Sequence, residues 1–142
     1  MPANTAPIYT RLGDVQWIGG ITTANTTTDL TSGTIYLAFT SDATNGGYVQ
    51  KIRFRAVTGT GNNNVATVAR IWINNGSATG TATNNILFDE ISLAATTGSA
   101  TSALAVYELP LNVALPAGYR IYITIGTTVA SGYNATVVGG KY

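Results

Sequence analysis

Short segments of alternating apolar and polar residues run along the whole chain, and clusters of Gly, Asn and Ser separate them. Segments of this kind, rich in Val, Ile, Tyr, Phe and Thr, predict β-strands. No apolar period typical of a helix persists long enough to predict one. The pattern predicts eight strands, at residues 15–21, 34–40, 48–57, 65–74, 85–93, 103–113, 119–126 and 133–138.

The regular spacing of these strands predicts an all-β fold, either a sandwich or a barrel. The chain has 142 residues, a length typical of one domain, and neither an internal repeat nor an interdomain linker is visible. Asn-Gly pairs within residues 44–47 and 74–77 suit tight turns, because both residues tolerate a positive φ. The Ala-rich segment 93–105 is diluted by Thr, Ser and Gly, which favours a loop over a helix.

The first residues differ from the rest of the chain. Residues 1–12 contain Pro2 and Pro7 and show no strand pattern, so we expect an extended arm at residues 1–14 ahead of a domain at residues 15–142. They carry neither the basic nor the apolar region of a signal peptide, and no apolar run approaches the roughly 18 residues that span a bilayer. We therefore expect synthesis in the cytoplasm and no membrane partner.

Charged residues make up 9% of the chain, and the formal net charge is +1. A typical domain has about 25% charged residues. Little electrostatic repulsion keeps copies of such a chain apart, which suits a component of an assembly. A secreted β-protein with an uncharged polar surface has a similar composition, so this feature does not decide the class by itself.

The chain lacks most of the side chains used in catalysis. It has no His and no Cys, which excludes His-dependent triads and zinc sites of the Cys/His type. Paired carboxylates remain conceivable, but Asp89 and Glu90 are adjacent on a predicted strand and point to opposite faces. The sequence therefore predicts a protein that is not an enzyme, with no catalytic residue, metal site or cofactor.

Three of the seven basic residues stand on alternate positions of one predicted strand: Lys51, Arg53 and Arg55. Alternate residues of a strand share a face, so these cations face outward while Ile52 and Phe54 face the core. The same alternation places Val49 on the outward face with the cations.

Three hypotheses account for this basic row. Nucleic-acid binding is disfavoured, because such domains usually have a pI above about 9 and this chain has a pI near 8.0. The cations can instead form cross-strand ion pairs with Asp89, Glu90 or Glu108. They can also bind another protein, since Arg is enriched in interfaces.

The two tryptophans leave two possibilities open. Trp72 alternates with Arg70 and Asn74, which predicts the outer face, and Trp17 lies near the start of the first strand. Either side chain can stack on a sugar, although Trp in a β-sandwich more often fills a core or an interface.

The order of several features from residue 48 to residue 142 resembles a known group of proteins. They are a basic strand (YVQKIRFRAV), a strand ARIWIN, a strand ILFDEISL, a turn LPAGY and the terminus GGKY. In this order they resemble small structural proteins of tailed bacteriophages, including cyanophages, and in particular the cement (decoration) proteins of phage heads.

The resemblance implies a jelly-roll sandwich, often a homotrimer, on the outer surface of the capsid. Its partners would be the major capsid protein and further copies of itself, with no nucleic acid and no cofactor. Its function would be to bridge capsid subunits and stabilise the shell. The interface residues expected on this basis are Tyr9, Arg11, Asp14, Lys51, Arg53 and Arg55.

Two further hypotheses come from other functional classes. One is a tail-fibre or baseplate module that binds host-surface carbohydrate, with Trp17 and Trp72 as stacking residues. The other is an accessory domain of a glycosidase or lyase, which the lack of paired acids disfavours.

Overall fold

A computed structural model describes residues 10–142 of the chain, and within them almost all regular structure is β. Sheet A contains four antiparallel strands in the order β1-β10-β3-β8, and sheet B contains four in the order β2-β9-β5-β6. The bounds of these strands are Leu12–Ile21 (β1), Tyr36–Thr40 (β2), Gly47–Ala56 (β3), Thr67–Asn74 (β5), Asn85–Leu93 (β6), Val106–Leu115 (β8), Arg120–Ile125 (β9) and Tyr133–Lys141 (β10).

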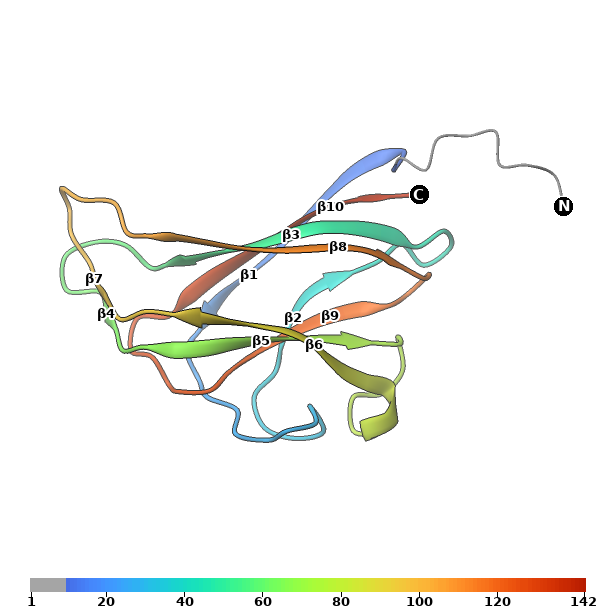
Figure 1. Ribbon diagram of the computed structural model, residues 1–142, viewed down its shortest axis with the longest axis horizontal. Helices are drawn as coiled ribbons and strands as arrows, with labels where there is room; N and C mark the ends of the chain where they lie inside the picture. Colours follow the sequence, from blue (N-terminus) through green and yellow to red (C-terminus); the bar gives the residue numbers. More distant parts are fainter. Residues whose placement is uncertain (1–9) are drawn as a thin grey trace, which may run out of the picture.

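The two sheets stack face to face as a sandwich (Figure 1). Along the chain, the long strands alternate between the sheets except for β5 and β6, which are neighbours in sheet B. Eight strands connected in this way, in two four-stranded sheets, form a jelly roll. The structure therefore confirms the prediction of a single-domain, all-β, antiparallel sandwich of the jelly-roll type.

Each of the eight predicted strands corresponds to one of the eight long strands. The prediction missed three short elements: the paired strands β4 (Asn63–Asn64) and β7 (Thr96–Thr97), and the 3-10 helix η1 (Ala82–Asn84). Two or three residues are too few to produce a hydrophobic period, which explains the omission. The expected arm was also too long, because residues 12–14 belong to β1, where Leu12 pairs with Lys141 of β10.

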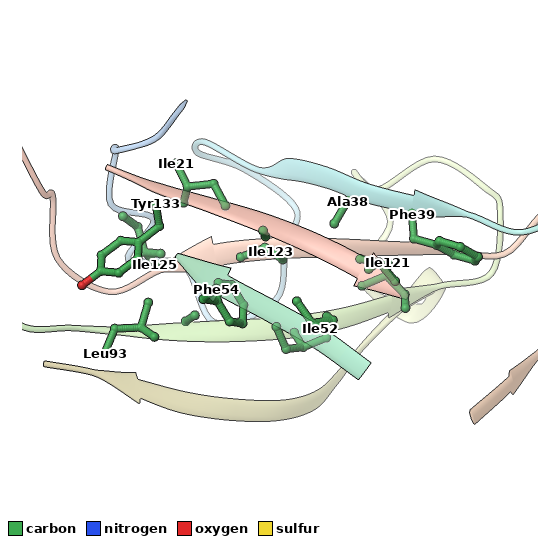
Figure 2. Close-up of a cluster of buried hydrophobic side chains, with 14 of the residues drawn as sticks. Ile21, Ala38, Phe39, Ile52, Phe54, Leu93, Ile121, Ile123, Ile125 and Tyr133 are labelled. Atoms are coloured by element: carbon green, nitrogen blue, oxygen red, sulfur yellow. The ribbon is translucent and has the colours of Figure 1, made fainter. Parts of the chain in front are cut away.

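Apolar side chains from the inner faces of both sheets form one core (Figure 2). Ile52 and Phe54 of β3 are fully buried in it, as the alternation predicts. Ile121, Ile123 and Ile125 contribute from β9 in the opposite sheet. The core thus fixes which face of each strand is left for solvent or a partner.

A β-bulge in β3 changes the alternation at one end of the basic row. Val49 pairs with Gly139 of β10 and Lys51 with Val138, so Gln50 is an extra residue on β3. A bulge of this kind reverses the face on which the following residues lie. As a result Val49 is fully buried in the core, and the prediction that it shares the face of the cations is wrong.

The segment between β1 and β2, residues 22–35, lies against the outer face of sheet B (Figure 1). Leu30 and Ile35 from this segment pack on Trp72 and Tyr122 of the sheet and form a second, smaller apolar cluster. Buried Asn25 holds the segment in shape, because its Nδ2 donates to the carbonyl oxygens of Ser32 and Thr34 at 2.8 and 3.0 Å. The outer face of sheet A, in contrast, is the face of the basic row.

Candidate functional site

The outer face of sheet A brings the basic row together with side chains from three other strands. The register places Trp17 (β1), Thr136 (β10), Arg53 (β3) and Glu108 (β8) in one line across the sheet. A second line contains Val15, Val138, Lys51 and Pro110, and a third contains Asn134, Arg55 and Val106. We call the residues of these three lines the A face.

Glu108 is the acidic partner of the row. Its carboxylate accepts hydrogen bonds from Arg53 Nε at 2.8 Å and from Lys51 Nζ at 3.2 Å. Of the three acids that the sequence offered as cross-strand partners, Glu108 therefore pairs with the row. Asp89 and Glu90 lie on β6 of the other sheet, where Glu90 pairs with Arg70 at 2.8 Å.

Arg55 is held differently from the other two cations. Its Nη1 donates to the carbonyl oxygen of Leu104 at 3.2 Å. The A face thus carries three cations and one carboxylate, which leaves an excess of two positive charges. This excess charge can attract an acidic partner. The ion pairs with Glu108 hinder such binding little, because exposed ion pairs contribute only about 0–1 kcal/mol each.

The hydrogen bonds from Arg53, and next those from Lys51, lower the pKa of Glu108 below its ordinary value. Both donors stabilise the ionised carboxylate, so Glu108 stays charged at neutral pH and down into the acidic range. The ion pairs with Glu108 direct the charged groups of Lys51 and Arg53 toward β8.

Trp17 is the most exposed large apolar side chain of the A face, with 73% of its surface accessible. Val15, on the same strand, and Val106, on the opposite edge, are about half exposed. Two strand spacings of about 4.8 Å each separate Trp17 from Arg53 along their line. Exposed Trp and Arg side chains close together are typical of the centre of a protein-binding surface.

Two other predicted interface residues, Arg11 and Asp14, do not join the A face. Asp14 lies near the start of β1 and accepts a hydrogen bond from Gln16 Nε2 at 3.1 Å; the same amide also donates to Thr40 of β2. Arg11 is exposed, and its backbone N donates to the carbonyl oxygen of Lys141. Tyr9 is outside the described residues.

The structure separates the two tryptophans that were candidates for sugar stacking. Trp72 is on the outer face of sheet B, as predicted, but only 3% of it is accessible, and its Nε1 donates to Thr124 Oγ1 at 2.9 Å. A hollow of about 240 Å³ beside it is lined by Thr26–28, Arg70, Leu87 and Glu90. The indole ring of Trp72 is thus covered, and of the two tryptophans only Trp17 presents its ring to solvent.

Within residues 10–142 no group of three or more His, Cys, Asp or Glu side chains is placed to hold a metal ion. Nor is any helix of that region long and apolar enough to cross a membrane.

The sequence indicated the cations but not their surroundings. Alternation in residues 48–57 was sufficient to find the outward row. The position of Trp17 beside that row depends on β10 lying between β1 and β3. Thr136 of β10 pairs with Trp17, 119 positions earlier in the chain, and with Arg53, 83 positions earlier. Only a correct jelly-roll topology, applied to the predicted strands, would have brought the two together.

Comparison with known proteins identifies no family for this chain. No model of a known protein family matches the sequence, and no curated protein shows significant similarity to it. One solved structure to which the chain is similar is that of infectious bursal disease virus, Gx strain, with a TM-score of 0.37 and 12% identity. The match covers 99% of this chain and 38% of the viral chain, so this chain spans less than half of its length. At this level the viral match carries no inference about function.

Proposed function

We propose that this chain is a structural protein of a virus particle that binds an acidic protein surface through the A face. The observation that carries the proposal is the composition of that face: three cations with a single carboxylate, beside a tryptophan that is 73% exposed. Positive charge steers the protein to its partner, and the indole ring supplies the apolar contact once water is excluded.

The more specific proposal is that the partner is the major capsid protein of a tailed bacteriophage and that the chain is a cement protein of the head. The order of motifs over residues 48–142 supports this choice of partner, and the jelly-roll topology is the fold that this resemblance implies. In this role each copy bridges neighbouring capsid subunits and raises the internal pressure that the shell withstands.

Binding to isolated heads tests the proposal directly. Expanded phage heads assembled without this protein are mixed with the purified chain, and co-sedimentation measures the number of copies bound at saturation. We expect saturable binding that weakens as salt is raised, because a screened charge excess attracts less. Binding to tails or to host polysaccharide in place of heads would contradict the cement proposal and favour a receptor-binding module.

A matched pair of variants localises the binding surface. The triple variant Lys51→Ala, Arg53→Ala, Arg55→Ala should lose head binding and keep its fold, as circular dichroism can verify. The double variant Arg70→Ala, Arg120→Ala also removes positive charge, but from strands of sheet B, and should bind normally. Equal loss in both variants would mean that only net charge matters and that the A face is not the site.

A further inference from the structure

The hollow beside Trp72, on the outer face of sheet B, has a composition suited to a small ligand. Its volume is about 240 Å³, and three parts of the chain line it: Thr26–28 of the segment over sheet B, Arg70 and Trp72 of β5, and Leu87 and Glu90 of β6. Ligand sites combine apolar surface with a few convergent polar groups, and sites for drug-sized molecules measure about 300–1,000 Å³. A hollow slightly below that range suits a ligand built on a single ring.

A β-bulge in β6 brings Leu87 and Glu90 to the same face of the sheet. The register pairs Trp72 with Leu87 and Arg70 with Glu90, so Phe88 has no partner on β5 and is the extra residue. Under strict alternation, residues three positions apart lie on opposite faces. The bulge cancels this offset, and an apolar and an acidic side chain of one strand therefore line one hollow. All three residues at the bulge are exposed: Ile86, Leu87 and Phe88.

The polar groups around the hollow have hydrogen-bonding capacity left for a ligand. Arg70 Nε donates to Glu90 Oε1 at 2.8 Å. Within residues 10–142, both Nη atoms of Arg70 and Oε2 of Glu90 form no hydrogen bond. Thr26 and Thr28 are exposed, and in the same part of the chain their hydroxyls have no partner either. The hollow therefore offers donors, an acceptor and two free hydroxyls together.

The threonine wall of the hollow is held in place by the fold. Thr27 turns inward, and its Oγ1 donates to Asn25 Oδ1 at 2.6 Å. The backbone N of Asn25 donates to the carbonyl oxygen of Ile125 in β9 at 2.8 Å, and Leu30 of the same segment packs on Trp72. A wall that is already ordered loses little conformational freedom when a ligand binds.

The balance of charge and polarity in the hollow selects the chemical class of the ligand. Arg70 and Glu90 neutralise each other, so neither an anion nor a cation is strongly attracted. A wholly apolar ligand would leave the ion pair and the hydroxyls without partners, which is costly. A guanidinium only donates and a carboxylate only accepts, whereas a hydroxyl does both. Two adjacent hydroxyls of one ligand can therefore bridge Arg70 and Glu90.

We propose that this hollow is a saccharide site that binds one pyranose ring. Vicinal hydroxyls of the ring bridge Arg70 and Glu90, the threonine hydroxyls bind the opposite edge of the ring, and its apolar face packs on Leu87. A pyranose carries all three features on one small, uncharged molecule. Trp72 stays covered beneath the ligand, so this mode of binding does not require stacking on a tryptophan.

The saccharide site is separate from the A face, which lies on the opposite sheet. The proposal therefore does not depend on what the A face binds. A copy held by a partner through its A face would direct the hollow away from that partner, toward saccharides in the surroundings. The double variant Arg70→Ala, Arg120→Ala should lose the saccharide while it retains head binding, so the two proposals can fail independently.

Fluorescence titration with simple glycosides tests the proposal. In the Trp17→Phe variant the remaining Trp72 lines the hollow and reports its occupancy. The probes are methyl α-D-glucopyranoside, methyl α-D-galactopyranoside and methyl α-D-mannopyranoside, and at least one should bind saturably. Glu90→Gln should weaken this binding at least about tenfold, because it removes a charged acceptor. Glu108→Gln is the matched control: it alters a carboxylate paired with an arginine on sheet A, and it should bind normally.

NMR mapping on the wild type keeps the test decisive if a variant fails to fold. The glycoside that binds should shift the indole resonance of Trp72 and the amide resonances of residues 26–28, and it should leave the indole resonance of Trp17 unchanged. The proposal would be overturned by absence of saturable binding for all three glycosides, by equal weakening in Glu90→Gln and Glu108→Gln, or by shifts centred on Trp17.

Discussion

The two tryptophans lie on the outer faces of opposite sheets, yet their environments are entirely different. Trp17, on the face of sheet A, is 73% exposed, whereas Trp72, on the face of sheet B, is 3% exposed. Trp72 is buried because residues 22–35 cross sheet B and place Leu30 on the indole ring. The orientation of a side chain on its strand does not by itself decide whether it is available for binding; the segment that covers the sheet decides.

The two outer faces also contribute differently to the stability of the fold. On sheet B, an apolar cluster and a buried Trp72–Thr124 hydrogen bond stabilise the fold. On sheet A, the charged side chains lie at the surface, where ion pairs contribute little to stability. The outer face of sheet B is therefore a structural layer, and the A face is the one that can change without loss of the fold.

Alanine substitution of each tryptophan gives the largest expected contrast. Trp72→Ala should lower the free energy of unfolding by about 3–5 kcal/mol, because it leaves a cavity beneath Leu30. Trp17→Ala should change it by no more than about 0.5 kcal/mol, as is usual at exposed positions. Urea unfolding measures both values. Similar losses in the two variants would show that the cover over Trp72 does not stabilise the domain.

A smaller loss of stability is expected from loosening residues 22–35, the segment that covers Trp72. Asn25→Ala removes the donor to the carbonyl oxygens of Ser32 and Thr34, which should cost about 1–3 kcal/mol. In a Trp17→Phe background, Trp72 is the remaining tryptophan, and acrylamide should quench its fluorescence more strongly after this substitution. Asn134→Ala, an exposed asparagine of the A face, serves as the control and should leave quenching unchanged.

The smallest expected effect is the shift in the pKa of Glu108, the carboxylate of the A face. An NMR titration should give Glu108 a pKa below the ordinary glutamate value, because Arg53 and then Lys51 donate to its ionised form. Because the pKa of Glu108 is lower in the folded state than in the unfolded state, its ionised carboxylate stabilises the fold at pH values above the ordinary glutamate pKa. This contribution is lost as the pH falls through the lowered pKa.

Two arginine variants identify the cause of that shift. Arg53→Ala should raise the pKa of Glu108 toward its ordinary value, since it removes the first donor. Arg55→Ala should leave it nearly unchanged, since Arg55 donates to the carbonyl oxygen of Leu104. A normal pKa in the wild type would mean that the ion pairs of the A face do not persist in solution.

The sequence was sufficient for the eight long strands because each is long enough to show its period. It was insufficient at Gln50 and Phe88, where one extra residue in a strand changes which side chains face outward. Val49 was misplaced for this reason, and the exposure of residues 86–88 was missed. Bulges depend on how a strand pairs with its neighbours, and a period within one segment does not contain that information.

The candidate site could be predicted only in part, because the pairing of distant strands is not visible in a local pattern. Local alternation found Lys51, Arg53 and Arg55, and composition found the acids, but the choice of Glu108 among them depends on β8 lying next to β3. The burial of Trp72 was not predictable either. It depends on Leu30, more than forty residues away, in a segment with no strand pattern.

The pairing of β1 with β10 has a mechanical consequence. Leu12 lies opposite Lys141, so the first strand is held along its length by the last strand of the fold. A pull on Leu12 directed along the strand axis loads all the rungs of that ladder together, in shear. A pull directed away from the sheet opens the rungs one after another, starting at Lys141. The domain should therefore resist a tensile load much better along β1 than across it.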